Sequence, residues 1–245
     1  MGTYGRLARR SSYCMIERPR ACPPELPLAS MSEGGTDYFA TSTGPKQTPM
    51  ADTRSFEWGA RLPALQTPRL TLRSLVPSDV ADVFAVFSDP MVMRYWDGAI
   101  MTTSQDAMNY IDHIHHGFRR RELFQWGIAD RPTNAVLGTC TLTHFSTNHE
   151  RAEIGFAIRQ ERWGQGLGSE AVAAVVAFAF DALKLHRIEA DVDPRNERSL
   201  RVLERLGFRR EGHLRERYYI NGERQDAVMM GLLRSEWNRG EGIQR

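Results

Sequence analysis

Lysine is nearly absent from this sequence of 245 residues: Lys46 and Lys184 are the only two, and arginine supplies the rest of the positive charge. The 32 basic residues are almost balanced by 30 acidic residues, so the formal net charge is +2. A net charge this close to zero exerts no strong general attraction on nucleic acids or on anionic membranes. The composition therefore favours neither of these as a partner.

Cysteine is also scarce, with Cys14, Cys22 and Cys140 in the whole chain. An odd number of cysteines at no metal-ligand spacing argues against a disulfide framework and is typical of a reducing compartment. We therefore expect a cytoplasmic protein without a metal centre. The sequence also has no apolar run of 18 or more residues, so no membrane-spanning helix is predicted.

Residues 1–57 differ in composition from the rest of the chain. They hold six of the twelve prolines and show no helical or strand periodicity. Such a segment buries too little apolar surface to offset the entropy of ordering it, so we expect a disordered extension. It has no apolar core of the kind a secretory signal needs, and Glu17 and Glu25 argue against a transit peptide. An alternative is that translation begins at Met50.

The folded domain is expected at residues 58–239, followed by a tail at 240–245. Apolar strands at Ala152–Ile158 and Arg187–Val192 flank a helix at Ser169–Leu183, the pattern of a βαβ crossover with parallel strands. We therefore predict an α/β fold with a mixed sheet and helices on both faces. The other predicted strands are Leu70–Leu75, Leu123–Ala129, Val136–Phe145, and a hairpin of Phe208–Ile220 and Glu223–Leu233 across Asn221-Gly222. The other predicted helices are Val80–Phe87, Ser104–Arg120 and Glu197–Leu206.

The most informative segment is Arg-Trp-Gly-Gln-Gly-Leu-Gly-Ser-Glu at residues 162–170, between a predicted strand and a predicted helix. Glycines let the main chain approach a ligand closely, and the first N–H groups of the following helix face an anion. A Walker loop would need a lysine, which is absent here, and the G-x-G-x-G spacing differs from a dinucleotide fingerprint. The segment therefore indicates another kind of phosphate site or an ordinary tight turn into a helix.

Together with three other parts of the chain, this loop resembles the acetyl-CoA pyrophosphate loop of the GNAT N-acetyltransferases, in their RimJ/RimL-like branch. Gly166 and Gly168 fill the glycine positions of the family, and Trp163 stands where that branch has tryptophan. The resemblance covers about residues 66–237 and implies the GNAT fold, a mostly antiparallel mixed sheet around a central βαβ unit that binds acetyl-CoA. The other matching segments are Thr67–Arg73 with Ser88–Arg94, Asp193–Phe208, and Tyr219–Gly222 with Asp226.

The resemblance also implies acetyl-CoA as the cosubstrate, with no metal. Phe156, Ala157 and Ile158 would pair their main chain with the pantetheine arm, and one of their N–H groups would face the acetyl oxygen. Asn196 would bond the same arm. The pyrophosphate would be held by Trp163, Gly164, Gln165, Gly166, Leu167, Gly168 and Ser169.

Glu153 and Ser199 are the expected catalytic residues. A carboxylate at the position of Glu153 commonly serves the family as the base, often through water; the alternative is a solvated or salt-bridged strand carboxylate, since Arg151 is near. Ser199 lies one helical turn beyond Asn196 and would point at the CoA sulfur; the alternative is a first-turn serine that bonds the backbone. Many GNATs protonate the thiolate with a tyrosine where this chain has Leu203, so that role falls to Ser199 or to water.

The expected reaction is acetyl transfer to a primary amine, and the branch name suggests a protein N-terminal α-amine. A small-molecule amine (a polyamine, amino acid or aminoglycoside) is an alternative, as is a GNAT-fold module that binds CoA without catalysis. Tyr95 and Trp96 would line the acceptor pocket or pack in the core. The histidines at 113, 115 and 116 lack the spacing of a metal site. We expect a monomer or homodimer.

Overall fold

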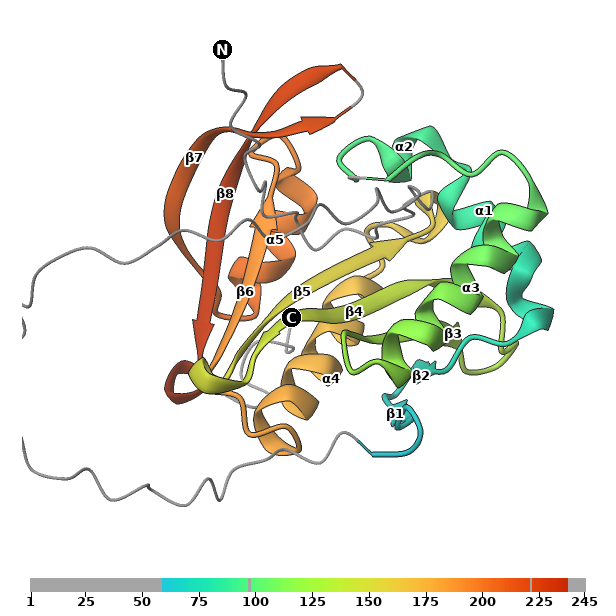
Figure 1. The fold of residues 1–245 in the computed structure, drawn as a ribbon, viewed down its shortest axis with the longest axis horizontal. Helices are drawn as coiled ribbons and strands as arrows, with labels where there is room; N and C mark the ends of the chain where they lie inside the picture. The colour runs from blue at the N-terminus through green and yellow to red at the C-terminus, as the bar shows by residue number, and fades with distance from the viewer. Residues whose placement is uncertain (1–58, 97, 221, 238–245) are drawn as a thin grey trace, which may run out of the picture. The chain divides into compact units, whose positions relative to one another are not determined.

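A computed structural model describes residues 59–96, 98–220 and 222–237, and these form one eight-stranded sheet with helices on both faces (Figure 1). The strand order is β1-β2-β3-β4-β5-β6-β8-β7. Neighbouring strands are antiparallel except for β5 and β6, which are parallel. The expected fold class, a mixed and mostly antiparallel sheet with a βαβ unit, is therefore confirmed.

The strands and helices begin and end close to their predicted positions. The strands are β1 (Leu65–Gln66), β2 (Leu70–Arg73), β3 (Phe124–Asp130), β4 (Val136–Ser146), β5 (Arg151–Ile158), β6 (Arg187–Val192), β7 (Arg209–Ile220) and β8 (Glu223–Leu233). The helices are α1 (Val80–Phe87), α2 (Pro90–Met93), α3 (Ser104–Arg119), α4 (Leu167–Asp181) and α5 (Glu197–Arg205), with short 3-10 turns between some of them.

The two faces of the sheet are covered by different helices. Successive side chains of a strand point to opposite faces, and Ile154 and Ala157 on β5 illustrate the division. Ile154 belongs to the core cluster that contains α4 residues such as Val172, whereas Ala157 belongs to the cluster built by α1 and α3. The apolar residues of α4 are buried in this way, as the sequence pattern predicts.

The parallel pair β5 and β6 is short. The strands are paired from Arg151 opposite Arg187 to Glu153 opposite Glu189, and beyond that point they diverge (Figure 1). On its other edge β5 stays paired with β4 as far as Ile158. Over the second half of β5, the main-chain groups on the side of β6 therefore form no hydrogen bonds to that strand. We call this side the open edge of β5.

Three details differ from the sequence prediction. Helix α4 begins at Leu167 rather than Ser169, because Gly166 adopts a left-handed conformation and forms its N-cap. The first long strand ends at Arg73, and Leu75 packs instead among the residues of α1 and α3. The short elements β1 and α2 were not predicted, because two to four residues are too few to show a hydrophobic period.

Within the described ranges, no helix is both long enough and apolar enough to cross a lipid bilayer. The expectations for residues 1–57, for the tail at 240–245 and for the turn at Asn221 lie outside the described residues. The cytoplasmic location expected from the cysteine usage stays a prediction.

Candidate active site

A cavity of about 650 Å³ is lined by the end of β5, the start of α4, the start of α5 and the segment around α2. Of the predicted site residues, Gln165 and Glu153 do not line it. The others do, and they are Tyr95, Trp96, Phe156, Ala157, Ile158, Trp163, Gly164, Gly166, Leu167, Gly168, Ser169, Asn196 and Ser199. The fold therefore brings together residues that are up to 104 positions apart in the sequence, from Tyr95 to Ser199.

The glycine loop presents the start of α4 to this cavity. Gly164 and Gly166 both have a φ of 76°, a conformation that glycine adopts at little cost. Gly166 is the N-cap of α4 and supplies no side chain to cap the helix; the Glu170 N–H bonds the Gly166 carbonyl at 3.1 Å. The first N–H groups of the helix thus have no partner within it, and the positive end of the helix dipole favours an anion here.

The main-chain N–H and carbonyl groups of successive residues in a strand point to opposite edges, so only every second residue of β5 faces its open edge. The Arg159 N–H donates to the Leu137 carbonyl of the neighbouring chain segment at 2.8 Å, so Arg159 turns its main chain towards β4. By the alternation of a strand, Ala157 faces β4 as well, whereas Phe156 and Ile158 face the open edge. The Ile158 carbonyl accepts a hydrogen bond from the Trp163 indole at 2.6 Å. The main-chain N–H and carbonyl of Phe156 and the N–H of Ile158 are therefore the groups left open at this edge. Of the three residues expected to pair with a pantetheine arm, Ala157 faces β4 instead.

The start of α5 carries Asn196 and Ser199 into the cavity. Asn196 is the N-cap of the helix, and its Oδ1 accepts a hydrogen bond from the Ser199 N–H at 3.2 Å. One end of the Asn196 amide is thus used in capping, which leaves its NH₂ group for a ligand. The Ser199 hydroxyl makes no hydrogen bond to any described residue, so it does not bond the backbone as the alternative supposed.

Three arginines on one face of α5 also line the cavity, and sequence reasoning missed them. Arg198, Arg201 and Arg205 follow each other at the three- and four-residue steps that share a helix face. Arg201 pairs with Glu197 at 2.8 Å. The guanidinium of Arg198 lies 4.9 Å from the centre of the Trp163 ring, and neither Arg198 nor Arg205 has a carboxylate partner among the described residues. Their spacing on a predicted helix was the signal that could have revealed them.

Tyr95 and Trp96 have different surroundings. Two guanidinium groups lie over the Tyr95 ring, with Arg94 5.2 Å and Arg195 5.7 Å from its centre. Trp96 is buried, and its ring centre is 5.7 Å from that of Phe87 in the core formed by α1 and α3. Both side chains line the cavity. Trp96 also packs in the core, which was the alternative to a role in the acceptor pocket.

Glu153 lies on β5 just before the strands diverge. Its Oε2 is 3.4 Å from Nδ1 of His144, and its Oε1 is buried with no hydrogen-bond partner among the described residues. Arg151, the nearby residue that the salt-bridged alternative named, pairs with Glu189 instead. Glu153 is therefore a carboxylate without an arginine, close to the cavity but outside its lining.

A buried carboxylate, Asp191, lies on the same face of the sheet as the half-buried Glu153, and sequence reasoning missed it. Its side chain is 2% exposed, and its Oδ2 accepts hydrogen bonds from Arg217 at 3.0 Å and from the Tyr218 hydroxyl. Burial, aided by the charge of Glu153, raises the pKa of Asp191 above its usual value. Arg217 and Tyr218 reach it because the register of β7 shifts between Leu214 and Tyr218. Asp191 is thus largely neutralised by its own neighbours.

The remaining candidate groups, three histidines and Cys140, do not line the cavity. His115 bonds the Leu75 carbonyl through Nε2 at 2.8 Å, and His113 and His116 are exposed on α3. No group of three or more His, Cys, Asp or Glu residues in the described ranges is arranged to hold a metal. Cys140 is buried in the core, and burial raises the pKa of its thiol far above the usual value, so it is not a nucleophile.

Comparison with protein families gives one match that spans this site. The profile of the family described as "Acetyltransferase (GNAT) domain" matches residues 69–209, which is more than half of the chain. The matched range contains the glycine loop, the open edge of β5 and the start of α5.

Known proteins with similar sequences match about 70% of the chain. YoaA of Bacillus subtilis, described as an uncharacterized N-acetyltransferase, is 36% identical over 70% of this chain and 97% of its own length. The spermidine N(1)-acetyltransferase of Vibrio cholerae is 30% identical over 71% of this chain and 98% of its own. The solved structure of Mycobacterium smegmatis RimJ in complex with CoA-disulfide has a TM-score of 0.64 at 23% identity, over 71% and 87% of the two chains, and so shares the fold.

Proposed function

Because this chain belongs to the GNAT family of acetyltransferases, and is thus an N-acetyltransferase, we propose that it transfers the acetyl group of acetyl-CoA directly to a primary amine. One observation supports this most: the uncapped start of α4, the open edge of β5 and the Ser199 hydroxyl line one cavity. Transfer from a thioester needs an anion site for the cosubstrate, an N–H group for the acetyl oxygen and a proton donor for the thiolate. The cavity offers all three.

The cosubstrate is held along the cavity in this proposal. The pyrophosphate binds the N–H groups at the start of α4, where the helix dipole favours an anion. The pantetheine arm pairs with the main chain of Phe156 and with the NH₂ group of Asn196. Trp163 does not bind the phosphates through its indole N–H, because that group already donates to the Ile158 carbonyl. This hydrogen bond fixes the position of the loop against β5.

The arginine face of α5 is assigned to the remaining phosphate of CoA. CoA carries a 3′-phosphate in addition to its pyrophosphate, and Arg198 and Arg205 are guanidinium groups without carboxylate partners among the described residues. Planar guanidinium groups bind phosphate well. These two arginines therefore favour the full CoA molecule over forms that lack the 3′-phosphate.

Replacing Arg205 with methionine is expected to weaken CoA binding by about three- to fivefold, the size of one partly exposed charge interaction. Dephospho-CoA lacks the 3′-phosphate, so its dissociation constant should stay within about twofold of the wild-type value for that ligand. Isothermal titration with both ligands measures the difference. An equal loss for both ligands would show that Arg205 acts on something other than the 3′-phosphate.

The chemical step follows from the same groups. Glu153 takes a proton from the ammonium acceptor, and because it lies outside the cavity lining, the proton passes through water. The neutral amine attacks the acetyl carbon while an open-edge N–H of β5 stabilises the charge on the acetyl oxygen. The C–S bond then breaks, the former amine nitrogen releases its extra proton to water, and the thiolate takes a proton from water or from the Ser199 hydroxyl, which regains a proton from water. Direct transfer needs no covalent enzyme intermediate.

A protein N-terminal α-amine is the acceptor that the charges favour. On the face of the sheet beside the open edge, Glu189 is paired with Arg151 and Arg187, and Asp191 with Arg217. Among these three carboxylates Glu153 alone lacks an arginine partner in the described residues. One uncompensated carboxylate matches an acceptor with one ammonium group, whereas a polyamine carries several positive charges. The similarity to a spermidine acetyltransferase makes a polyamine the second candidate.

An acetyl-transfer assay over a panel of amines tests the function and the acceptor together. The panel contains a peptide with a free α-amine, the same peptide with a blocked N-terminus, spermidine, an amino acid and an aminoglycoside. We expect acetylation of the free peptide with the highest kcat/KM and none of the blocked one. A preference for spermidine would overturn the α-amine assignment, and CoA binding without transfer to any amine would contradict the catalytic proposal.

A further inference from the structure

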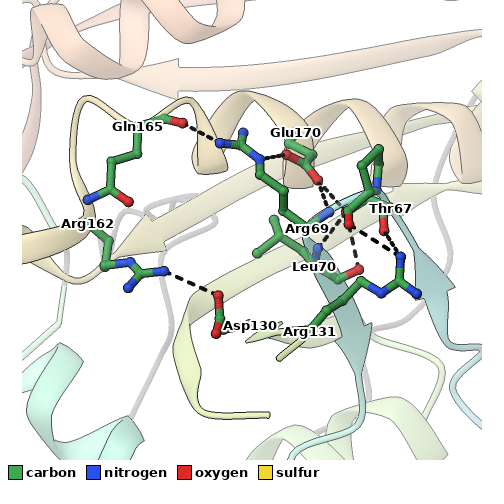
Figure 2. A network of polar contacts seen from close by, with 9 residues as sticks. Thr67, Arg69, Leu70, Asp130, Arg131, Arg162, Gln165 and Glu170 are labelled. Carbon is green, nitrogen blue, oxygen red and sulfur yellow. Dashed lines mark hydrogen bonds and ion pairs between the residues drawn. The ribbon is translucent and has the colours of Figure 1, made fainter. Parts of the chain in front are cut away.

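A network of polar contacts centred on Arg69 lies against the glycine loop (Figure 2), and neither Arg69 nor its partner Glu170 lines the cavity. Arg69 immediately precedes β2, and its Nη1 donates a hydrogen bond to the carbonyl of Gln165 at 2.8 Å. Its Nη2 lies 3.4 Å from the position that a Cβ on Gly166 would take. Neither Arg69 nor Gln165 lines the cavity, although Gly164 and Gly166 do. Arg69 therefore contacts the loop from the face opposite to the ligand.

This contact fixes the direction of one particular N–H group. The Gln165 carbonyl and the Gly166 N–H belong to the same peptide plane, and in a trans peptide they point in opposite directions. When Arg69 holds the carbonyl on the rear side, the Gly166 N–H must face the other way, which is the side of the cavity. Glycines on both sides of Gln165 leave this peptide free to rotate, so an external contact is needed to fix it.

Arg69 is itself held in place. Its Nε donates to Glu170 Oε2 at 2.6 Å, and its main-chain N–H donates to Glu170 Oε1 at 2.9 Å. The Thr67 hydroxyl adds a third hydrogen bond to this carboxylate at 2.6 Å. The side chain of Glu170 is 12% exposed, and these hydrogen bonds hold its pKa below the usual value despite the burial. A planar guanidinium bridges the carboxylate and the carbonyl at once, which a lysine ammonium cannot do with the same geometry.

We propose that Arg69 is a positioning residue for the cosubstrate loop, a role that rests on the proposed use of acetyl-CoA. It holds the Gln165–Gly166 peptide with its N–H directed at the pyrophosphate, and it offsets the charge that Glu170 places in the first turn of α4. A carboxylate at that point would otherwise oppose the binding of an anion. The same network ties Arg162, which lines the cavity, to Asp130 at 3.2 Å (Figure 2).

Replacing Arg69 with methionine is expected to weaken CoA binding by about fivefold, because one correctly directed hydrogen bond to the pyrophosphate is lost. Arg69→Lys keeps the charge but not the double contact, so its affinity should fall by a similar factor. With S-acetylpantetheine, which has no pyrophosphate, kcat/KM should stay within about twofold of the wild-type value. Isothermal titration with CoA and initial rates with both acetyl donors measure these effects, with thermal denaturation as the check on folding.

Arg131 provides the matched control. Its Nη1 donates to the carbonyls of Thr67 and Pro68 at 3.1 and 3.3 Å, so it anchors the same turn without contacting the loop (Figure 2). Arg131→Met should therefore leave CoA affinity within about twofold.

Several results would overturn the positioning role. They are wild-type affinity in Arg69→Met, wild-type affinity in Arg69→Lys, an equal loss with S-acetylpantetheine, or an equal loss in Arg131→Met. If the wild-type protein itself fails to bind CoA, the proposed function falls together with this inference.

Discussion

Replacing Glu153 with glutamine is expected to lower turnover at neutral pH by roughly 10²–10⁴-fold, the usual contribution of a general base. The acceptor amine is mostly protonated at this pH, and the variant has no carboxylate to remove its proton. The surroundings of Glu153 support this role, since its Oε1 is buried without a partner and Arg151 pairs elsewhere. Raising the pH towards the pKa of the amine should restore part of the lost rate, because a growing fraction of the acceptor is then already neutral.

The pH–rate profile of Ser199→Ala provides the contrast. Ser199 is proposed to protonate a thiolate, which is a fairly good leaving group, so its loss should cost about tenfold, the value of one hydrogen bond to a charged group. That loss should change little with pH, unlike the loss in Glu153→Gln. Wild-type turnover of Glu153→Gln at pH 7 would instead make Glu153 a structural carboxylate, and the base would have to be sought among other groups.

Replacing Gly166 with valine is expected to weaken CoA binding by at least tenfold, which corresponds to about 1.4 kcal/mol or more. Gly166 has a φ of 76°, where a β-branched residue is strongly disfavoured, and the new Cβ would lie 3.4 Å from Arg69. The backbone must shift to relieve this strain, and the N–H groups at the start of α4 shift with it. Isothermal titration with CoA, with thermal denaturation to confirm folding, measures the result.

Gly222 offers a matched control for the strain itself. Its φ is 86°, and a Cβ there would meet nothing within 4 Å, so Gly222→Val introduces the same kind of backbone strain outside the cavity. We expect a lower melting temperature and an unchanged dissociation constant for CoA. A folded Gly166→Val protein that binds CoA with wild-type affinity would refute the assignment of the loop to the pyrophosphate.

Much of the fold follows from local sequence patterns. The helix at Val80–Phe87 and the strands at Arg187–Val192 and Glu223–Leu233 have the predicted bounds, because a clear hydrophobic period and well-placed turn residues specify them locally. The glycine loop is also readable from the sequence, since only glycine adopts such backbone angles cheaply and the helix that follows has an unmistakable apolar stripe. The family resemblance depended on the same local segments.

The partners of individual polar groups were decided by tertiary structure alone. Arg69 and Gln165 are 96 residues apart, and no spacing rule connects them; they meet because β2 and the start of α4 lie against each other in the folded domain. Arg151 forms its ion pair with Glu189 and not with Glu153, and this partner depends on how β5 and β6 pair in the sheet. The open edge of β5 arises in the same way, because it requires two neighbouring strands to diverge after three paired residues.

The sequence by itself determined the class of fold, the position of the glycine loop before a helix and the kinds of chemical groups available. Periodicity and turn chemistry act over a few residues, and a single chain displays them directly. Tertiary structure decided which main-chain groups lie beside the cavity, which carboxylate lacks an arginine partner and which arginines line the cavity. Those properties depend on long-range pairing and burial, where each polar group takes the partner that the packed chain brings within reach.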